Sequence, residues 1–468
     1  MGLKIYNTLT RSKQDIHDII GDRKKVNMYT CGVTVYDKCH IGHARSLYIF
    51  DVIRNYLEHR GYDVNFVRNI TDIDDKIINK ARETGKDWKE VVAENIAAYQ
   101  NDLKRLGIGR VKAEPRATDK ENIKEMQKYI SAMIKQDFAY EADGDVYFNV
   151  RKYSEKFKYG ELSGQSIDEM EEAVRIEKDE KKKDPLDFAL WKKSKEGEPS
   201  WKSPWGEGRP GWHIECSCMS RKHLRCDTLD IHAGGRDLIF PHHENEIAQA
   251  QAYDGKKFAH CWIHHGLLTI NRQKMAKSLG NFITIEDAVQ KYGANELKMF
   301  FLSSHYRSPI DFSEDRMHEA RKNYNKISEI VKRLHSENIA TGGAVTGEFL
   351  EKKNAFIEAM DDDFNTPQAL AILFDTINLS NKLIDDHMSG AKIKLRGAMN
   401  IIGEIMDIFG LTIMKEAPLN KREELLLKDR ETARKNKNFK KSDELRDALK
   451  NLGIIVKDTP QGQVWSRA

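Results

Sequence analysis

Two cysteines and two histidines lie within thirteen residues in the segment MYTCGVTVYDKCHIGHARS, residues 28–46. Thiolates and imidazoles are good zinc ligands, so this spacing at first suggests a zinc finger. The histidines, however, belong to the tetrapeptide HIGH, which opens a segment with helical periodicity. At a helix amino terminus, His40 and His43 can donate hydrogen bonds to phosphates, and Gly42 permits a nucleotide to approach closely. The alternative is that both histidines only cap the helix.

A second cationic motif, KMAKS, occupies residues 274–278 and is followed by Leu, Gly and Asn. Lys274 and Lys277 in a mobile loop are suited to neutralising the charge of a triphosphate as pyrophosphate leaves. The alternative is an ordinary solvated turn rich in lysine. Together, in this order, HIGH and KMAKS resemble the paired signatures of the class I aminoacyl-tRNA synthetases.

Further potential metal ligands lie far downstream of Cys31. Cys216 occurs in GWHIECS, and His242 and Glu246 occur in FPHHENE. The last two are four residues apart, so they share one face of a helix. A borderline-soft ion bound there would favour a thiolate substrate over a hydroxyl.

These segments resemble the cysteinyl-tRNA synthetases over practically the whole chain. The matching blocks include NITDIDDK, EPRATD, DPLDFALWK, GEPSW, GRPGWHIECS, DDDFNTPQAL and the tail DTPQGQVW. The resemblance implies one Zn²⁺ per chain, ATP with Mg²⁺, and the partners L-cysteine and tRNA(Cys). The zinc ligands that it implies are Cys31, Cys216, His242 and Glu246. The other site residues that it implies are Gly32, Thr71 and Trp212 around cysteine, His232 and Asp237 in the nucleotide pocket, and His40, His43, Lys274 and Lys277 for ATP and catalysis.

Four protein ligands ordinarily close a tetrahedral zinc site. We therefore expect the substrate thiolate to enter as a fifth ligand or to displace Glu246; the alternative is a closed zinc that only joins distant segments. Ala276 stands where the family usually has serine, so one side-chain hydroxyl is missing there. We expect small buried or incidental thiols at Cys39, Cys218, Cys226 and Cys261. Three further histidines are expected to line the pocket or to pack in the core: His243, His264 and His265.

The elements that would position these residues form a parallel crossover unit. Residues 24–36 favour a strand, residues 41–62 show helical periodicity that stops at Gly61, and residues 63–70 favour a second strand. Ligands bind outside the carboxyl ends of the strands in such sheets, which is where HIGH lies. A hairpin is predicted at Asp143 and Gly144 within an inserted segment.

The end of the chain is predicted to form a separate module of two amphipathic helices and two short strands. Basic residues interleaved with aromatic ones suit single-stranded RNA, because phosphates attract cations and unstacked bases pack on flat rings. The alternative is a solvated helix. The resemblance places anticodon contacts at Arg434, Phe439, Asp443, Arg446, Asp458 and Trp465.

Length and composition indicate the broad class of the protein. A chain of 468 residues with 40% apolar and 32% charged residues is expected to form several globular domains. The amino terminus has no apolar export signal and no apolar run is long enough to span a bilayer, so we expect a cytoplasmic protein with reduced thiols and no membrane partner. We also expect a monomer. The net charge of +4 leaves room for local basic faces.

The predicted fold class is α/β: a Rossmann-like parallel-sheet catalytic domain of class I with an inserted connective domain, a helical bundle and a small α+β anticodon-binding module. The predicted boundaries are 1–112 and 205–313 for the catalytic halves, 113–204 for the insertion, 314–417 for the bundle and 418–468 for the module. The predicted activity is ATP-dependent activation of cysteine and its transfer to tRNA. Two alternatives are a ligase that joins cysteine to an amino sugar and a catalytically silent paralogue that binds RNA.

Overall fold

The structure is a computed structural model of the chain. It describes residues 2–109, 111–173, 181–275, 279–339, 341–342, 344–386, 391–413, 419–459 and 462–467. The chain divides into two compact units, Met1–Leu411 and Thr412–Ala468, which are described separately below. None of the helices in the described ranges is long and apolar enough to cross a lipid bilayer.

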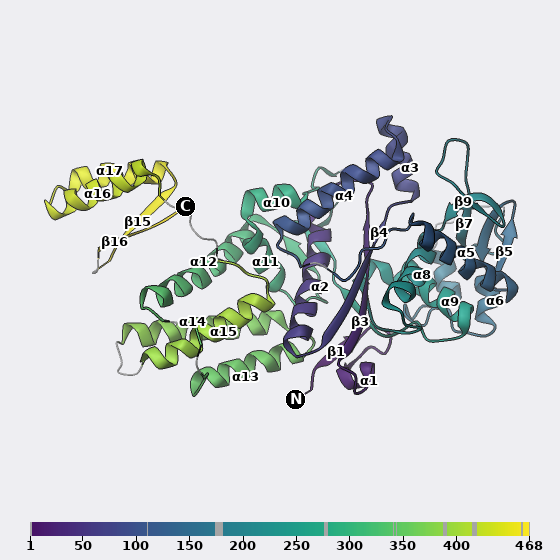
Figure 1. Ribbon diagram of the computed structural model, residues 1–468, viewed down its shortest axis with the longest axis horizontal. Helices are drawn as coiled ribbons and strands as arrows, with labels where there is room; N and C mark the ends of the chain where they lie inside the picture. The colour runs from purple at the N-terminus through teal and green to yellow at the C-terminus, as the bar shows by residue number, and fades with distance from the viewer. Residues whose placement is uncertain are drawn as a thin grey trace. The chain divides into compact units, whose positions relative to one another are not determined.

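A four-stranded sheet with the strand order β11-β10-β3-β4 forms the centre of the first unit, and its neighbouring strands are parallel (Figure 1). The strands are β3 (Lys25–Thr34), β4 (Asp63–Thr71), β10 (Leu229–Gly235) and β11 (Ala259–His265). Helix α2 (Ile41–His59) connects β3 to β4. The predicted strand–helix–strand crossover is therefore confirmed, and its loop carries HIGH at the carboxyl end of β3.

Helix α2 packs through the apolar stripe that its sequence predicts. Leu47, Phe50, Ile53 and Leu57 are all buried. Because these positions recur every three to four residues, they share one face of the helix. Tyr48 and Val52 are buried as well, so α2 is enclosed on more than the face that the predicted stripe forms.

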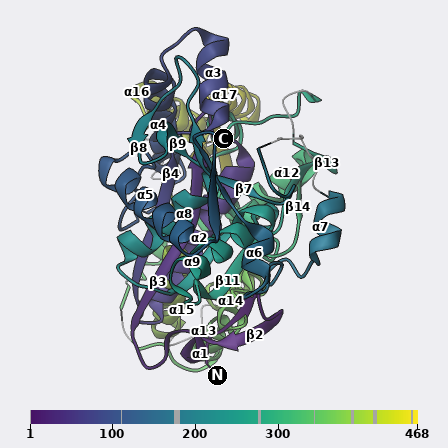
Figure 2. The same ribbon diagram turned by 90° about the vertical axis from the view of Figure 1, so that its right-hand side faces the viewer.

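The segment between β4 and β10 contains a second sheet, whose strand order is β5-β6-β7-β9-β8 and whose pairs are antiparallel. It faces the viewer in Figure 2, with helices α5 and α6 beside it. Asp143 and Gly144 have φ angles of 50° and 82°, as a tight hairpin requires, so the hairpin prediction is confirmed. Trp191 and Trp205 lie in the hydrophobic core of this segment. Its elements are α3 (Asp75–Thr84), α4 (Trp88–Arg105), α5 (Lys120–Lys135), β5 (Ala139–Ala142), β6 (Asp145–Phe148), α6 (Val150–Ser154), α7 (Ile167–Ala173), β7 (Phe188–Lys193), β8 (Trp201–Ser203), β9 (Gly206–Pro210) and α8 (Trp212–Leu224).

The rest of the first unit completes the sheet domain and adds a group of helices. Helix α12 begins at Glu314, where the sequence predicts that the helical part starts. The amino-terminal elements are β1 (Lys4–Asn7), β2 (Ser12–Asp15) and α1 (Ile16–Ile20). Those around and after β11 are η1 (Arg236–Leu238), η2 (Ile239–His243), α9 (Glu244–Asp254), β12 (Leu268–Ile270), β13 (Gln273–Lys274), α10 (Ile285–Tyr292), α11 (Ala294–Leu302) and β14 (Ile310–Phe312). The helices that follow are α12 (Glu314–Ser336), α13 (Glu348–Asp361), α14 (Thr366–Asp385) and α15 (Ala391–Ile408).

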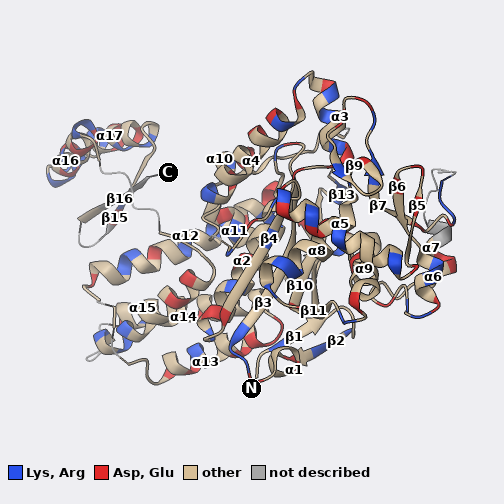
Figure 3. Ribbon diagram, turned by 45° about the vertical axis from the view of Figure 1, so that its right-hand side comes forward, with Lys and Arg blue, Asp and Glu red and all other residues tan. Residues whose placement is uncertain are grey.

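The second unit contains two helices and one antiparallel strand pair, as predicted. They are α16 (Lys421–Lys435), α17 (Phe439–Asn451), β15 (Ile454–Thr459) and β16 (Gly462–Arg467). Leu427, Leu449, Ile454 and Val456 form its small apolar core. Figure 3 shows basic and acidic residues interleaved along both helices.

Candidate metal centre and nucleotide site

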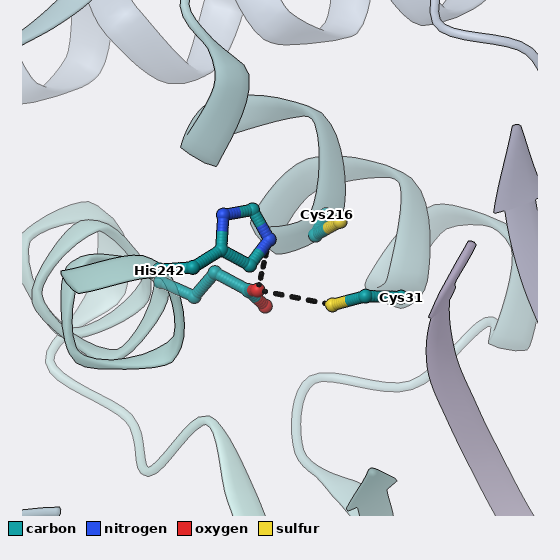
Figure 4. Close-up of side chains that lie close together, drawn as sticks. Cys31, Cys216 and His242 are labelled. Atoms are coloured by element: carbon teal, nitrogen blue, oxygen red, sulfur yellow. Dashed lines mark hydrogen bonds and ion pairs between the residues drawn. The ribbon is translucent and has the colours of Figure 1, made fainter. Parts of the chain in front are cut away.

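The four predicted zinc ligands converge from three regions of the chain. Cys31 comes from β3, Cys216 from α8, His242 from η2 and Glu246 from α9, and one ligand atom of each lies within 4.8 Å of all the others. Figure 4 shows Cys31, Cys216 and His242 pointing into the same space. Cys216, His242 and Glu246 are buried. Two thiols, an imidazole and a carboxylate in a dry pocket fit Zn²⁺.

Hydrogen bonds already orient this group. The Nε2 atom of His242 lies 2.9 Å from Oε1 of Glu246, and the Cys31 thiol donates to the same oxygen over 3.5 Å. The other ring nitrogen of His242, Nδ1, lies 2.8 Å from Nδ1 of His213. A partner on the outer nitrogen fixes the ring of a metal-binding histidine, which is the role that His213 can take. The sequence interpretation did not single out His213.

The charges of this group favour a cation. Burial by itself would raise the pKa of Glu246, but the facing His232 and His242 hold it well below its usual range. Burial opposes ionisation of Cys216 as well, yet hydrogen bonds from Cys31 and His242 lower its pKa to about 6. Burial would lower the pKa of His242, whereas Glu246 raises it to about 10. A metal ion can therefore replace protons among ligands that already include a thiolate and a carboxylate.

Gly32 and Thr71, two of the residues predicted to surround cysteine, are joined by a chain of hydrogen bonds through Asn69. Gly32 N–H donates to Asn69 Oδ1 at 2.8 Å, Asn69 Nδ2 donates to Thr71 Oγ1 at 3.2 Å, and the Thr71 hydroxyl donates to Glu215 Oε2 at 2.8 Å. A Cβ atom on Gly32 would lie 1.5 Å from the carbonyl oxygen of Asn69, so only glycine fits there. Trp212 is 38% exposed, and its ring centroid lies 4.1 Å from that of His242. The sequence interpretation missed Asn69 and Glu215, although Asn69 lies in the quoted block NITDIDDK.

His232 and Asp237, both predicted for the nucleotide pocket, occupy different environments. His232 is fully buried on β10, and its Nε2 lies 2.6 Å from Oε2 of Glu246. Asp237 is exposed on the turn η1, and its charge acts on His40. The structure thus brings His232 against the metal group and Asp237 toward the HIGH turn.

The two histidines of HIGH cap α2 reciprocally. His40 Nδ1 accepts hydrogen bonds from the backbone N–H groups of Gly42 and His43 at 3.1 and 3.3 Å, and His43 Nδ1 accepts from His40 N–H at 3.2 Å. The two rings stack with their centroids 3.7 Å apart. Burial lowers the pKa of His40 to about 4 and that of His43 to about 3. Both rings are therefore neutral near pH 7, and each carries its proton on Nε2, which remains available as a donor.

The structure places the start of the KMAKS segment beside the HIGH turn. Lys274 ends β13, and its carbonyl accepts from Asn281 Nδ2 at 3.2 Å. The following segment is pinned to the HIGH turn, because Ile41 N–H donates to the Ile283 carbonyl at 3.1 Å. Lys277 and Ala276 lie outside the described residues.

In the second unit, three arginines surround one carboxylate. Asp458 accepts two hydrogen bonds from Arg430, each of 2.9 Å, and one each from Arg434 at 2.8 Å and Arg446 at 2.9 Å. Hydrogen bonds from Arg430 in particular lower the pKa of Asp458. Arg430 is fully buried and was not among the predicted residues. Phe439 is 60% exposed.

The other two predicted tail residues differ in their surroundings. Asp443 is exposed on α17, with Oδ1 3.6 Å from Nη1 of Arg446. Trp465 is partly buried and packs against the apolar core of the unit. The exposed Phe439 is thus better placed than Trp465 to pack against an unstacked base.

Comparison with known proteins identifies the family. Residues 18–322 match the family described as tRNA synthetases class I (C) catalytic domain, residues 355–413 match the DALR domain, and residues 417–465 match the cysteinyl-tRNA ligase anticodon binding domain. The cysteine–tRNA ligase of Geobacter metallireducens is 47% identical over 491 residues, which cover 99% of both chains. The chain belongs to the cysteine–tRNA ligase family. The corresponding protein of Oceanobacillus iheyensis is 45% identical over 475 residues and covers 100% of both chains.

Solved structures agree with the fold of this cysteine–tRNA ligase family member. The methionyl-tRNA synthetase of Mycobacterium tuberculosis in complex with methionyl-adenylate superimposes with a TM-score of 0.62 at 14% identity, over 82% of this chain and 90% of that one. The LeuRS–tRNA–LeuAMS ternary complex of Agrobacterium radiobacter gives a TM-score of 0.62 at 10% identity, with 84% of each chain covered. The predicted class I fold, with its parallel sheet and helical carboxyl-terminal region, is confirmed.

Proposed function

We propose that the chain activates L-cysteine with ATP and transfers it to tRNA(Cys). The cysteine carboxylate attacks the α-phosphorus of ATP, which yields cysteinyl-adenylate and pyrophosphate. A ribose hydroxyl at the 3′ end of the tRNA then takes the cysteinyl group and releases AMP. The observation that carries this proposal is the convergence of two cysteines, one histidine and one glutamate at 4.8 Å or less, directly beside Trp212.

The residues proposed to hold one Zn²⁺ are Cys31, Cys216, His242 and Glu246. Bound zinc would stabilise the substrate thiol as a thiolate at neutral pH, whereas the far more basic hydroxyl of serine would gain much less. This matters because a pocket that reads shape alone rejects so close an analogue only about a hundredfold. We expect Glu246 to yield when the thiolate binds, because a carboxylate oxygen is the weakest donor of the four toward this ion.

The nucleotide is proposed to bind between the HIGH turn and the KMAKS segment. The Nε2 donors of His40 and His43 would contact phosphate oxygens, while Lys274 and Lys277 would neutralise charge as pyrophosphate leaves. Mg²⁺ would accompany ATP, since it binds nucleotide phosphates with few protein ligands. Orientation and electrostatics would supply most of the rate, because no protein nucleophile is required.

The remaining parts of the proposal concern partners and location. The unit beyond residue 411 would bind the anticodon through Arg434, Phe439 and Arg446, since these side chains combine cations with an exposed ring. We propose that the enzyme works as a cytoplasmic monomer. The domain boundaries proposed are residues 1–112, 113–204, 205–313, 314–417 and 418–468.

The test is cysteine-dependent exchange of pyrophosphate into ATP, followed by charging of total tRNA, with serine as the competing substrate. Zinc-edge X-ray absorption with and without cysteine examines the metal directly. One additional sulfur ligand is expected when cysteine binds. An unchanged sulfur count at saturating cysteine would show that zinc only joins distant segments of the chain. Cys39→Ser is the matched control, because Cys39 is a buried thiol outside the ligand group.

A further inference from the structure

Arg45 is a fully buried arginine on the second turn of α2, directly after the HIGH turn. Its Nη1 atom donates to the carbonyls of Gly266 and Leu267 at 2.8 and 2.9 Å. Its Nη2 atom donates to the carbonyls of Tyr306 and Ser308 at 3.2 and 2.6 Å. Burial lowers the pKa of Arg45 to about 10, and no carboxylate in the described part of the chain forms an ion pair with it. The side chain is thus a buried cation that is held by backbone carbonyls.

Such an arrangement is suited to fixing geometry. Taking a charge out of water is costly, and an apolar side chain of similar volume would avoid that cost, so burial of the charge is weak evidence for a role in stability. The guanidinium is planar and presents its donors in a rigid fork. Because Arg45 uses one nitrogen for each of two backbone segments, it holds these segments and α2 at a set separation.

The two segments lie at the base of a small sheet with the strand order β13-β12-β14. Residues 266–267 lead from β11 into β12, and residues 306–308 precede β14. Strand β12 pairs with β14 on one side and with β13 on the other, and β13 ends at Lys274. Arg45 therefore connects the helix that begins with HIGH to the sheet on which the KMAKS segment begins.

The HIGH turn itself holds the other end of the KMAKS segment. Ile285 N–H donates to the carbonyl of Cys39 at 3.0 Å. At the near end, a Cβ atom on Gly42 would lie 3.4 Å from the terminal methyl of Met275, so the two motifs are in close contact. Both attachments leave from the start of α2. A shift of α2 against β12 would therefore change the separation between the HIGH histidines and Lys274.

We propose that Arg45 is a positioning residue for adenylate formation, which fixes the separation between the phosphate donors of the HIGH turn and the charge of Lys274. The inference rests on the proposed function and adds a residue outside the groups assigned to ATP. Separation matters at this scale, because a misplacement of about 1 Å can slow a reaction roughly a hundredfold. If Arg45 only stabilised the fold, its loss would lower the free energy of unfolding and leave the rate per folded molecule unchanged.

Arg45→Lys tests the proposal, because lysine keeps the charge but cannot reproduce the planar fork across both segments. The kcat of cysteine-dependent pyrophosphate exchange should fall by at least about tenfold, while the KM for ATP stays within about threefold of the wild type. Transfer of cysteine from preformed adenylate to tRNA should be unchanged, since pyrophosphate has already left. The matched control is Arg68→Lys, which alters another buried arginine of the first unit, bonded to Glu114, and should leave exchange unchanged.

A double-mutant cycle with Lys274→Ala separates positioning from stability. If Arg45 acts through Lys274, the loss of exchange in Arg45→Lys/Lys274→Ala should be smaller than the product of the single losses by a factor of about ten. Circular dichroism checks each fold, and Arg45→Gln replaces Arg45→Lys if the latter is not native.

The proposal and the function on which it rests fail in different ways. Wild-type kcat in a folded Arg45 variant, or single losses that multiply in the double variant, would refute the positioning role while Lys274→Ala still slows exchange. Normal exchange in Lys274→Ala would instead refute the ATP contact assigned to that lysine, and the positioning role with it.

Discussion

His40 caps α2, and substitutions can separate this structural role from the chemical role that is proposed for it. Its Nδ1 caps α2, and its Nε2 is the proposed donor to a nucleotide. His40→Ala should cost about 1 kcal/mol of stability through the lost cap, and His40→Asn should cost less because asparagine is a good cap. Both substitutions remove the Nε2 donor, so both should slow cysteine-dependent exchange roughly a hundredfold, or about 3 kcal/mol. Thermal unfolding and exchange assays measure the two effects.

The matched comparison is His43→Ala, which removes the reciprocal cap and the second donor together. An exchange rate in His40→Asn equal to that of the wild type would mean that His40 only caps the helix. Lys277→Ala should slow exchange by a similar factor, since this lysine is assigned to the same phosphates.

The buried histidines should make the fold sensitive to mild acid. Burial lowers the pKa of His40 to about 4, that of His43 to about 3 and that of His265 to about 4. An unfolded histidine titrates near pH 6.5, so below that pH the unfolded chain binds more protons than the folded one. Stability is therefore retained above about pH 6.5 and should fall as the pH drops toward 4, by about 1.4 kcal/mol per pH unit for each histidine.

Urea unfolding between pH 7.5 and 5 measures this slope. His265→Asn is the informative variant, because it removes one buried imidazole outside the proposed zinc ligands. Its slope against pH should be lower than that of the wild type by one proton. Equal slopes would mean that His265 binds its proton over the same pH range in the folded protein as in the unfolded chain.

The block DDDFNTP, between α13 and α14, ties the carboxyl-terminal helices to the sheet domain. Asp363 is fully buried and accepts from Tyr6 N–H at 2.9 Å, from the Tyr306 hydroxyl at 2.7 Å and from Arg307 Nε at 2.7 Å. Asp361 accepts from the Tyr56 hydroxyl of α2 at 2.6 Å. This block is one of those that carry the family resemblance. In the structure it anchors the carboxyl-terminal helices to the sheet domain through these buried hydrogen bonds.

Asp363→Ala should destabilise the first unit by about 3 kcal/mol, since three donors lose their acceptor and Arg307 loses its ion pair. The neighbouring Asp362→Ala is the control, because its ion pair with Lys13 joins side chains that are 53% and 37% exposed. Such exposed pairs contribute little, about 0–1 kcal/mol. Urea unfolding compares the two, and equal losses would contradict the anchoring role.

Hydrogen bonds within the first unit hold its carboxyl-terminal end. The Tyr48 hydroxyl and Asn55 Nδ2 of α2 donate to the carbonyls of Phe409 and Ile408 at 2.8 and 3.1 Å. Lys298 Nζ donates to the Gly410 carbonyl at 2.5 Å. These bonds satisfy carbonyls at the end of α15 that would otherwise lack partners. Residues of the first unit therefore supply partners for the carbonyls at the end of its last helix.

A chain that ends near Pro418 should still activate cysteine but charge tRNA poorly. Every residue assigned to zinc or ATP lies within the first unit, and the arginines around Asp458 lie in the second. Exchange and charging assays on the truncated and full chains measure both steps. In the full chain, Arg434→Ala/Arg446→Ala should reduce charging and leave exchange unchanged. Full charging by the truncated chain would mean that the anticodon is bound elsewhere.

Local pattern was enough to predict one strand–helix–strand unit and one hairpin of the first unit. The strand–helix–strand unit of β3, α2 and β4 follows from β-branched runs and an apolar repeat of three to four residues, and both are properties of neighbouring residues. The hairpin at Asp143 and Gly144 follows in the same way from turn chemistry. The pairing of HIGH with KMAKS, and of Cys31 with ligands about 200 residues away, came from resemblance to a family, because spacing along the chain carries no information about such distant contacts.

Side-chain orientation around the sheet edge depends on the packing of α8, α9 and η2. The bond from Gly32 to Asn69, the bond from Thr71 to Glu215, the position of His213 behind His242, and the approach of Glu246 Oε2 to His232 all join residues from different elements. Each contact is decided by how those elements meet in a close-packed interior, where shifts of a fraction of an ångström change the partner. For the same reason, the family resemblance names the four proposed zinc ligands, whereas the contacts of His213 and His232 with them are recognised only once α8, β10 and η2 are packed together.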